Sequence, residues 1–493
     1  MSLKINTIKI MKKYILLIIV FLTITIQSQN SDLANLMSGK IELFQLVKNV
    51  DKSVYGYFSI SKIDRKSKDE IKYEYVLLDD SLNKVMSGEF VDHKYKKFDA
   101  FFFVANKVKD KIFISKAFYY HDRGPKNFEF TTHRSLDLKT NKISDEFYYK
   151  DGQFTSGIRE EKGIVSELRN NAYAYEVIQP FKNGFLVLEI AKKGKKGIIK
   201  NNKQIQLIKA FDVDRKELWS YNFNPEHKNL SQYVELMNND SFVFSTKEKS
   251  DEFIYSINPD TGKLIFKYKI ENEDKKNLIF RVKAVNDDFI ILGNSSPYKA
   301  SGFDITNDEG LFKITLNKQG KEISKNNFLW KTHGMSSKLN LDKRGRMDKL
   351  QLATINRYTF NDGSVSILTK KFKKKGAYRV DSDFILLNFD KDFKLKNYNS
   401  INSDISTRGY LFSQKIKNGS GVVFFIENVN YYSEKGNINI ATIIDGKFNL
   451  ESIPVDFKES FIRPIKAKEG FVLFREYDEE KEIDRIRLEK LNY

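Results

Sequence analysis

The stretch "YSINPDTGKLIFKYKI", residues 255–270, decides the expected fold. An apolar strand pattern runs into Asn-Pro-Asp-Thr-Gly-Lys and then resumes as alternating apolar and basic residues. Pro, Asp and Gly favour a tight turn, and period-two alternation is typical of a strand with one buried face. The stretch therefore predicts two strands joined by an Asp-centred turn.

The same sequence pattern, two strands joined by a polar turn, recurs along the chain. Its clearest further copies are "FDVDRKELWSYNF" (211–223), "ITLNKQGKEISKNNF" (314–328), "LNFDKDFKLKNYNSI" (387–401) and "IIDGKFNLESIPV" (443–455), with weaker ones at 76–90 and 135–149. Most copies follow a second recurrent element, a polar turn leading into a strongly apolar strand, as in "NGFLVLEIA" from Asn183. The order of the parts is fixed although their spacing is irregular. Each unit is therefore expected to hold three or four short strands.

Seven fairly complete units and a shorter last one account for most of the chain. They cover about 54–90, 97–149, 174–223, 231–271, 279–330, 354–402, 408–456 and 460–493. Repeats of this length and content predict an all-β protein with a single β-propeller of seven or eight blades, eight being preferred. A strand in "GKIELFQLVKN" (39–49) would complete the short last unit and close the ring, which removes exposed edges. The alternative is two β-sandwiches in tandem.

The N-terminus predicts export. "MKKYILLIIVFLTITIQSQ" begins at Met11 with two lysines, continues through an apolar core and reaches the small residue Ser28. These are the parts of a secretory signal peptide, and the apolar run is shorter than the ~20 residues of a membrane-spanning helix. We therefore expect a signal peptide over 1–28 and a propeller domain over 29–493, located in the periplasm, at the outer-membrane surface or outside the cell. A retained N-terminal anchor is the alternative, and no transmembrane segment is expected after cleavage.

Composition restricts the chemistry. The absence of cysteine excludes disulfides, thiolate metal sites and a cysteine nucleophile. The formal net charge is +19, and four of these charges lie within residues 1–28, which leaves +15 for the mature chain. Such a balance favours acidic partners, an unknown protein or an anionic glycan. A biased genome composition would give the same charge. A nucleic acid partner is not expected, because no recognition motif accompanies the charge.

The repeats resemble those of the pyrroloquinoline-quinone-type propeller superfamily. Asp260-Thr261-Gly262-Lys263 matches that superfamily's turn, and Phe266 stands where a tryptophan is usual. Asp214 and Trp219 match in a second unit, although other residues replace Thr-Gly-Lys there. The resemblance implies the fold and says little about chemistry. Because the quinone and calcium ligands have no counterparts here, it points to cofactor-free, scaffold-like members. The chain also resembles uncharacterised exported propeller-like proteins of Bacteroidetes-type bacteria.

Catalytic and metal-binding motifs are sparse. The five histidines are scattered without ligand spacing, at His93, His121, His133, His227 and His333. No Gly-x-Ser-x-Gly nucleophile motif occurs. Oxygen ligands suited to calcium follow one another at Asp304, Asn307, Asp308 and Glu309, but without the spacing of a known calcium loop. We therefore expect neither a cofactor nor a metal, and no catalytic residue can be assigned.

The strongest candidate for a partner site is a basic insertion at 331–352. The residues chosen are Trp330, His333, Lys343, Arg344 and Arg346. Arginine pairs bidentately with carboxylate or phosphate, and long connections often carry function. Two other basic runs, at 192–196 and 370–379, are interpreted as solvated hairpin tips. These features together predict a non-catalytic binding or scaffold protein. The alternative is a secreted glycan-acting hydrolase or lyase on the same scaffold.

Overall fold

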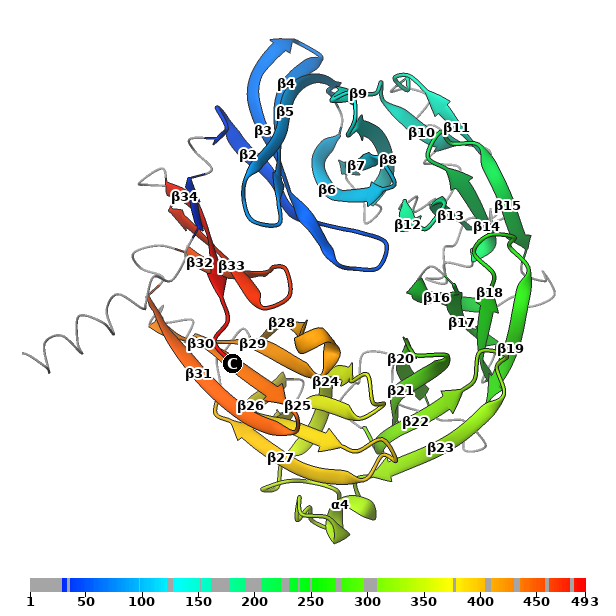
Figure 1. Cartoon of the computed structure of the whole chain (residues 1–493), viewed down its shortest axis with the longest axis vertical. Helices are drawn as coiled ribbons and strands as arrows, with labels where there is room; N and C mark the ends of the chain where they lie inside the picture. Colours follow the sequence, from blue (N-terminus) through cyan, green and yellow to red (C-terminus); the bar gives the residue numbers. More distant parts are fainter. Residues whose placement is uncertain are drawn as a thin grey trace, which may run out of the picture.

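The described residues form a closed ring of β-sheets, an eight-bladed β-propeller (Figure 1). The computed structural model describes residues 29–32, 36–96, 98–121, 127–150, 152–160, 178–190, 205–222, 230–237, 240–248, 251–271, 277–296, 308–375, 378–403, 409–429, 435–456, 461–478 and 483–493. The preferred prediction of eight blades is confirmed, and the tandem β-sandwich is excluded. Within each blade the strands are antiparallel, and they follow one another outward from the ring centre in chain order, except that the outermost strand of blade 8 comes from the N-terminus.

Blades 1 to 4 occupy the first half of the chain. Blade 1 consists of β2 (Lys40–Lys48), β3 (Val54–Ser67), β4 (Glu70–Asp79) and β5 (Lys84–His93). Blade 2 consists of β6 (Asp99–Val108), β7 (Lys111–His121), β8 (Asn127–Asp137), β9 (Lys142–Ile143), β10 (Phe147–Lys150) and β11 (Gln153–Ser156). Blade 3 consists of β12 (Gln179–Phe181), β13 (Gly184–Ile190), β14 (Ile205–Asp212) and β15 (Glu217–Asn222). Blade 4 consists of β16 (Leu230–Met237), β17 (Phe242–Glu248), β18 (Asp251–Ile257) and β19 (Leu264–Ile270).

Blades 5 to 8 complete the ring. Blade 5 consists of β20 (Asn277–Val285), β21 (Asp288–Ser296), β22 (Gly310–Leu316) and β23 (Glu322–Leu329), followed by the short helix α4 (His333–Ser336). Blade 6 consists of β24 (Gln351–Thr359), β25 (Val365–Lys375), β26 (Tyr378–Phe389) and β27 (Leu395–Ile401). Blade 7 consists of β28 (Gly409–Ile416), the 3-10 turn η2 (Lys417–Gly419), β29 (Gly421–Val429), β30 (Lys435–Ile444) and β31 (Lys447–Asp456). Blade 8 consists of β32 (Phe461–Lys466), β33 (Phe471–Asp478), β34 (Ile483–Lys490) and β1 (Gln29–Asp32).

An N-terminal strand closes the ring, but it is not the strand expected from the sequence. β1 is the outermost strand of blade 8, with Gln29 opposite Leu488 and Asp32 opposite Arg485. The segment 39–49 instead supplies β2, the inner strand of blade 1, which pairs with β3. Its apolar residues Leu43 and Val47 are buried in the blade 1 core, so this segment belongs to its own blade. A four-residue strand beside an apolar leader gives no comparable pattern in the sequence.

The Asp-centred turns join the third and fourth strands of the blades. In blade 4, Asn258 Oδ1 accepts hydrogen bonds from the backbone N–H groups of Asp260 (2.9 Å) and Thr261 (3.1 Å). The side chain of this Asn thus accepts hydrogen bonds from the turn backbone and holds the turn in its conformation. The same position in other blades is held by Asp79, Asp137, Asp212, Asn317 and Asp390. The turn-forming side chain is therefore an Asp or Asn at the start of the turn, two residues before Asp214 in blade 3 and Asp260 in blade 4.

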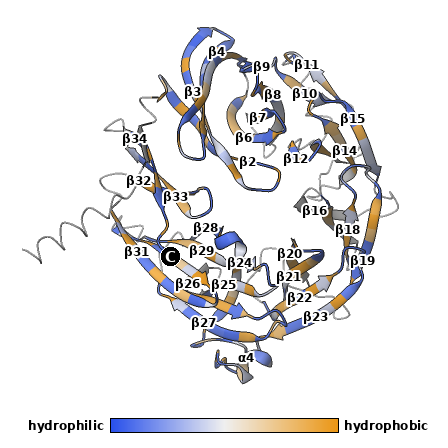
Figure 2. Cartoon of the chain, viewed as in Figure 1, coloured by the Kyte–Doolittle hydropathy of each residue, from blue (hydrophilic) through white to orange (hydrophobic). Residues whose placement is uncertain are grey.

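The hydrophobic cores lie between neighbouring blades. Outer strands alternate hydrophobic and polar residues, and β19 shows buried positions at Phe266 and Ile270 (Figure 2). One core joins Phe181 and Trp219 of blade 3 to Phe244 of blade 4, and similar clusters bridge other junctions. Burial of apolar surface at the junctions therefore holds the blades together. Among the described residues, no helix is both long and apolar enough to cross a bilayer.

Candidate anion-binding site

Inner strands of four blades end in basic residues. Lys48 is the last residue of β2, Lys466 is the last of β32, and Lys415 is the last but one of β28. Lys283 lies two residues before the end of β20, and Lys52 lies in the β2–β3 turn. Because the innermost strands of a propeller run in one direction along the ring axis, these ends lie on the same side of the ring. The β2–β3 hairpin and η2 both project toward the ring centre (Figure 1). We refer to the five residues as the central lysines.

The charges of the central lysines influence one another across blades. Burial, together with the positive charges of Lys415 and Lys52, lowers the pKa of Lys283 to about 8. Burial likewise lowers the pKa of Lys466 to about 8, with contributions from Lys48 and Lys52. Burial and the charge of Lys48 also lower the pKa of Lys52. Four blades of a ring thus bring like charges close together, which disfavours protonation of Lys52, Lys283 and Lys466.

Few acidic groups compensate these charges. Lys415 Nζ lies 3.8 Å from a Glu469 carboxylate oxygen. Over the residues that the structure describes, the other four central lysines form no ion pair. Lys283 donates a hydrogen bond to the backbone carbonyl of Thr359 and its Nζ lies 4.8 Å from the ring centroid of Tyr358. Lys466 Nζ donates to the Ser413 carbonyl at 3.3 Å. Such a group of cations held by neutral acceptors is suited to bind an anion.

A second group of charges is buried between blades 1 and 2. Lys116 Nζ donates to Asp92 Oδ2 (2.8 Å), and Arg134 Nη2 donates to Asp92 Oδ1 (2.8 Å). Tyr95 donates its hydroxyl to Glu146 Oε1 at 3.2 Å. The side chains of Asp92, Lys116 and Glu146 are no more than 5% exposed. We refer to Asp92, Lys116, Arg134 and Glu146 as the buried charge cluster.

The protons of this cluster are unevenly distributed. Burial and the negative charge of Asp92 raise the pKa of Glu146 well above its usual range. Burial alone would also raise the pKa of Asp92, but the positive charges of Lys116 and Arg134 hold it below its usual value. Glu146 therefore keeps a proton beside ionised Asp92. Since its charges face each other out of water, this cluster can hold the blades together but cannot recognise a partner.

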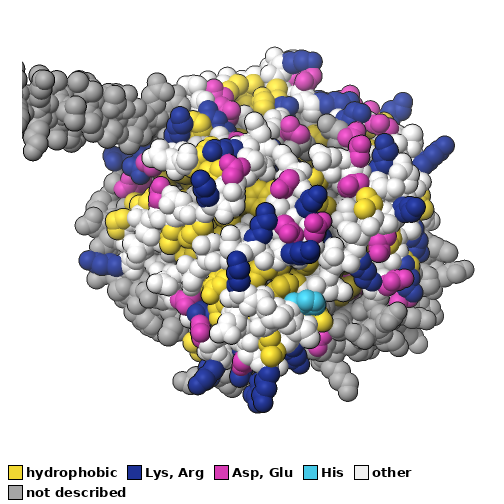
Figure 3. Space-filling view, turned by 60° about the horizontal axis from the view of Figure 1, so that its bottom comes forward, with side chains coloured by type: hydrophobic (Ala, Val, Ile, Leu, Met, Phe, Trp, Pro, Cys, Tyr) yellow, Lys and Arg dark blue, Asp and Glu magenta, His cyan; other side chains and the backbone are white. Residues whose placement is uncertain are grey.

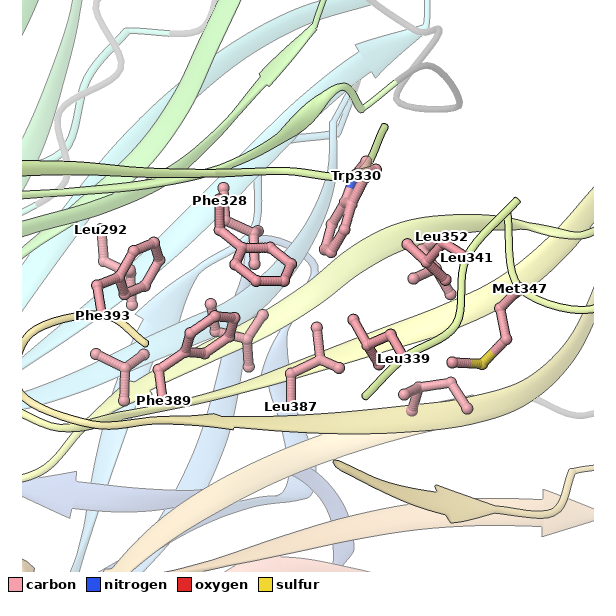
Figure 4. Close-up of a cluster of buried hydrophobic side chains, with 14 residues drawn as sticks. Leu292, Phe328, Trp330, Leu339, Leu341, Met347, Leu352, Leu387, Phe389 and Phe393 are labelled. Atoms are coloured by element: carbon pink, nitrogen blue, oxygen red, sulfur yellow. The ribbon is translucent and has the colours of Figure 1, made fainter. Parts of the chain in front are cut away.

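The insertion at 331–352 lies outside the ring, where α4 is seen in Figure 1. Trp330 is 2% exposed and packs among Phe328, Leu339 and other core residues, so its ring is not available to a partner (Figure 4). His333 is exposed, and its Nδ1 accepts a hydrogen bond from the backbone N–H of Leu329 at 3.0 Å. The five residues chosen from the sequence therefore do not form one exposed surface.

The three lysine and arginine residues chosen from the insertion differ in their partners. Arg346 donates to Asp342 Oδ2 at 2.8 Å and 2.7 Å, and its hydrogen bonds lower the pKa of Asp342 to about 2. Lys343 and Arg344 are exposed and make no ion pair with any described residue. Two cations of the insertion thus remain free for a partner. The insertion and the central lysines are separate surfaces.

The other sequence candidates do not converge on a catalytic centre. His133 is fully buried with its Nδ1 2.9 Å from Ser115 Oγ, and burial lowers its pKa to about 3. Asp308 accepts a hydrogen bond from Asn294 at 2.6 Å, while Asp304 and Asn307 lie outside the described residues. His227 and the basic run at 192–196 also lie outside them. Across the described ranges, no group of His, Asp and Glu could hold a metal ion.

The run at 370–379 differs from its interpretation as a solvated tip. It does span the β25–β26 hairpin, but its first two lysines are largely buried and paired with carboxylates. Lys370 lies 3.2 Å from Asp381, and Lys371 lies 2.8 Å from Asp383. On the face shown in Figure 3, lysine and arginine side chains are interspersed with acidic ones. Positive and negative side chains are therefore mixed on this face of the molecule.

Sequence reasoning missed the central lysines. Their signal is a basic residue one to three positions before the turn that follows an inner strand, as in "VKAVND" (282–287), "QKIKNG" (414–419) and "PIKAKEG" (464–470). Aligning the units at their turns places these residues in one column.

The chain has low structural similarity to several solved structures. No family model matches it, and no curated protein matches it by sequence. Among solved structures, the WD40 domain of SCAP from fission yeast is 8% identical over 94% of this chain and 98% of that chain, with a TM-score of 0.42. Kluyveromyces lactis Hsv2 is 11% identical over 84% and 98%, with a TM-score of 0.36. The polysaccharide lyase Uly1 is 8% identical over 92% and 90%, with a TM-score of 0.38. At such identities these likenesses say nothing about function.

Proposed function

We propose that this protein is an exported, non-catalytic binding protein whose propeller holds a polycarboxylate partner at the central lysines. The observation that carries the proposal is the convergence of five lysines from four blades, four of them without an ion-pair partner among the described residues. Clustering and burial oppose the protonation of Lys52, Lys283 and Lys466. A bound anion relieves this repulsion, so the arrangement gains stability when occupied.

Two polymers of different backbone test the proposal. Polygalacturonate and poly-L-glutamate both carry repeated carboxylates, and they represent an anionic glycan and an acidic protein segment. The double variant Lys283→Met/Lys466→Met is expected to bind the polymer about tenfold more weakly, because each ion pair contributes up to about 1 kcal/mol. Isothermal titration calorimetry at low and physiological salt measures the effect.

A matched control removes the same charge elsewhere. Lys318 and Lys391 are exposed in turns of blades 5 and 6, and the double variant Lys318→Met/Lys391→Met should bind as the wild type does. Equal losses in both double variants would show that net charge alone drives binding. No binding of either polymer to the wild type would remove the proposed function.

The insertion offers a second, smaller contact. Lys343 and Arg344 are exposed and free of ion pairs with described residues, so they remain candidates for a protein partner in the cell envelope. Lys343→Glu/Arg344→Glu should reduce capture of that partner from an envelope extract. Equal capture by wild type and variant would exclude this surface.

One observation favours a lyase as the alternative function. A lysine with a pKa of about 8 is partly unprotonated near neutral pH and can serve as a general base. Neighbouring cations would stabilise the carboxylate of a uronic acid while the proton on the carbon next to that carboxylate is removed. A rise in ultraviolet absorbance from new carbon–carbon double bonds in polygalacturonate, absent with heat-killed protein, would replace the binding proposal with this one.

Export remains part of the proposal because the sequence of residues 1–28, outside the described residues, has the parts of a signal peptide. Cleavage after Ser28 would leave every described strand intact, since β1 begins at Gln29. Mass spectrometry of the protein from its native host should find a mature chain that begins at Gln29. An intact leader on membrane-bound protein would support the anchor instead.

A further inference from the structure

Two blade junctions are filled by an aromatic side chain from the outer strand. Trp219 of β15 donates its indole N–H to the Pro259 carbonyl of blade 4 at 2.8 Å. A Cβ added at Gly262, in the same turn, would stand 2.6 Å from the Trp219 ring. Phe266 of β19 occupies the corresponding place against blade 5, where a Cβ at Gly320 would stand 2.3 Å from its ring. The aromatic ring therefore seals the space between adjacent turns at these junctions.

Strand register identifies the equivalent position in blade 6. Trp219 pairs with Ala210 and Phe266 pairs with Ser256, in each case just before a bulge that precedes the turn. In blade 6 the residue in this register is Asn397, which pairs with Asn388 immediately before the same bulge. The junction between blades 6 and 7 therefore has an amide where blades 3 and 4 have a ring.

A cavity of about 500 Å³ occupies this junction. Its floor is apolar and buried, and includes Val365, Phe389 and Ile443. A chain of hydrogen bonds crosses its wall: buried Ser366 donates to Asn388 at 2.6 Å, and Asn388 donates to Asn397 Oδ1 at 2.7 Å. The Asn397 side chain is exposed, and its amide nitrogen makes no hydrogen bond with any described residue.

The rim of the cavity is polar and of mixed charge. It carries the carboxylates of Asp362 and Asp445, the ammonium of Lys396 and the hydroxyl of Ser420. Ser364 donates its hydroxyl to Asp362 at 2.6 Å, and such hydrogen bonds outweigh burial and lower the pKa of Asp362. Two carboxylates against one ammonium give no net preference for an anion. The site therefore offers carboxylate acceptors, an amide donor and an apolar floor.

We propose that this cavity, the blade 6–7 pocket, binds a neutral, hydroxyl-rich ring such as one unit of a glycan. A sugar ring presents hydroxyl groups that donate to carboxylates and accept from an amide, and an apolar face that packs on a hydrophobic floor. A volume of about 500 Å³ lies in the usual range of small-molecule sites. The ring of the ligand takes the place that Trp219 and Phe266 take at the junctions after blades 3 and 4.

The pocket and the central lysines are neighbours with separate chemistry. Asn361, on the pocket rim, donates to the Asn418 carbonyl of η2 at 2.6 Å, and η2 directly follows the strand that holds Lys415. Lys283 bonds the carbonyl of Thr359, the residue before Phe360 of the pocket wall. The proposal does not depend on the anion site, because a neutral sugar gains nothing from the lysines.

Saturation-transfer difference NMR on the full mature chain tests the pocket. The probes are the methyl glycosides of glucose, galactose, mannose and xylose, and their expected dissociation constants are in the millimolar range. Asn397→Phe restores a ring in the register of Phe266 and should abolish transfer to the sugar. Asn397→Ala removes the amide donor without filling the space, and should weaken binding about fivefold.

Asn449→Phe is the matched control, because Asn449 is the third residue of the outer strand of blade 7 as Asn397 is of blade 6. It should bind like the wild type, as should Lys283→Met/Lys466→Met. Thermal melting shows whether each variant folds. If Asn397→Phe does not fold, Asn397→Ala still tests the proposal. Transfer from none of the four probes to the wild type, or undiminished transfer to both Asn397 variants, would overturn the proposal. If Lys283→Met/Lys466→Met loses polygalacturonate binding but still binds the sugars, the pocket proposal is supported as independent of the anion site.

Discussion

Two groups of charges, the buried charge cluster between blades 1 and 2 and the central lysines, differ in how they are balanced. In the buried charge cluster, Asp92 accepts hydrogen bonds from both Lys116 and Arg134 at 2.8 Å, and Glu146 holds a proton. Among the central lysines, burial and mutual repulsion lower the pKa values of Lys283 and Lys466 to about 8. Charges that a fold pairs internally serve its stability. Charges that a fold leaves facing one another are available to a ligand.

The largest expected effect comes from unbalancing the buried charge cluster. Lys116→Met should lower the free energy of unfolding by about 3–5 kcal/mol, because it leaves part of the Asp92 charge buried without a partner. Urea denaturation followed by tryptophan fluorescence measures it. The control is Lys72→Met, which breaks an exposed pair with Glu89 (2.6 Å) and should cost less than about 1 kcal/mol. Similar losses in the two variants would erase the distinction between the two kinds of charge.

Removing a central lysine should have the opposite sign on stability. Lys283→Met/Lys466→Met relieves repulsion, so its melting temperature should equal or slightly exceed that of the wild type, while polycarboxylate affinity falls about tenfold as described above. Differential scanning calorimetry without ligand measures the first quantity. A clear destabilisation would mean that these lysines hold the ring together, as Lys116 does.

The affinity for polycarboxylate should also fall as the pH rises from 7 to 9. Lys283 and Lys466 lose their protons near pH 8, well below the usual value of 10.5, so the site loses positive charge in this interval. We expect a several-fold weakening, measured by calorimetry at constant ionic strength. The variant Lys283→Met/Lys466→Met should show little change over the same range. An affinity that is constant to pH 9 would show that these two residues do not contact the ligand.

A smaller effect concerns the stability of the buried charge cluster itself. The pKa of Glu146 is raised in the folded state, so between its unfolded value of 4.5 and its folded value only the folded chain holds the proton. Stability due to this group is therefore present at low pH and decreases as the pH rises through that window. Glu146→Gln should remove this decrease in thermal melts recorded from pH 5 to 8. A variant as pH-dependent as the wild type would assign the effect to other groups.

The sequence predicted the fold well because its local signals are physical ones. The recurrent Asp or Asn is the side chain that fixes each turn, as Asn258 does, and apolar alternation marks the strands that pack between blades. Trp219, selected through a family resemblance, proved to be an interblade contact. Trp330 looked like part of a recognition surface but is buried, because an aromatic residue at a strand end gives no sequence signal of which way it points.

The candidate sites were harder to predict because they are assembled across the ring. Lys52 and Lys466 influence each other although more than 400 residues separate them, and no local pattern links them. The blade 6–7 pocket exists where Asn397 replaces the aromatic ring that Trp219 and Phe266 supply in other blades. That comparison needs the strand register of three blades. A repeated fold hides its functional positions among equivalent structural ones.

The pairing of β1 with β34 has a consequence for the order of folding. Gln29 lies opposite Leu488, so this contact encloses nearly the whole chain and carries the largest loop-closure entropy of the described pairings. Blades made of consecutive strands can form as soon as their own residues are available, whereas blade 8 needs both ends of the chain. We therefore expect blade 8 to be completed last, by the pairing of β1 with β34 after the other blades have packed against one another.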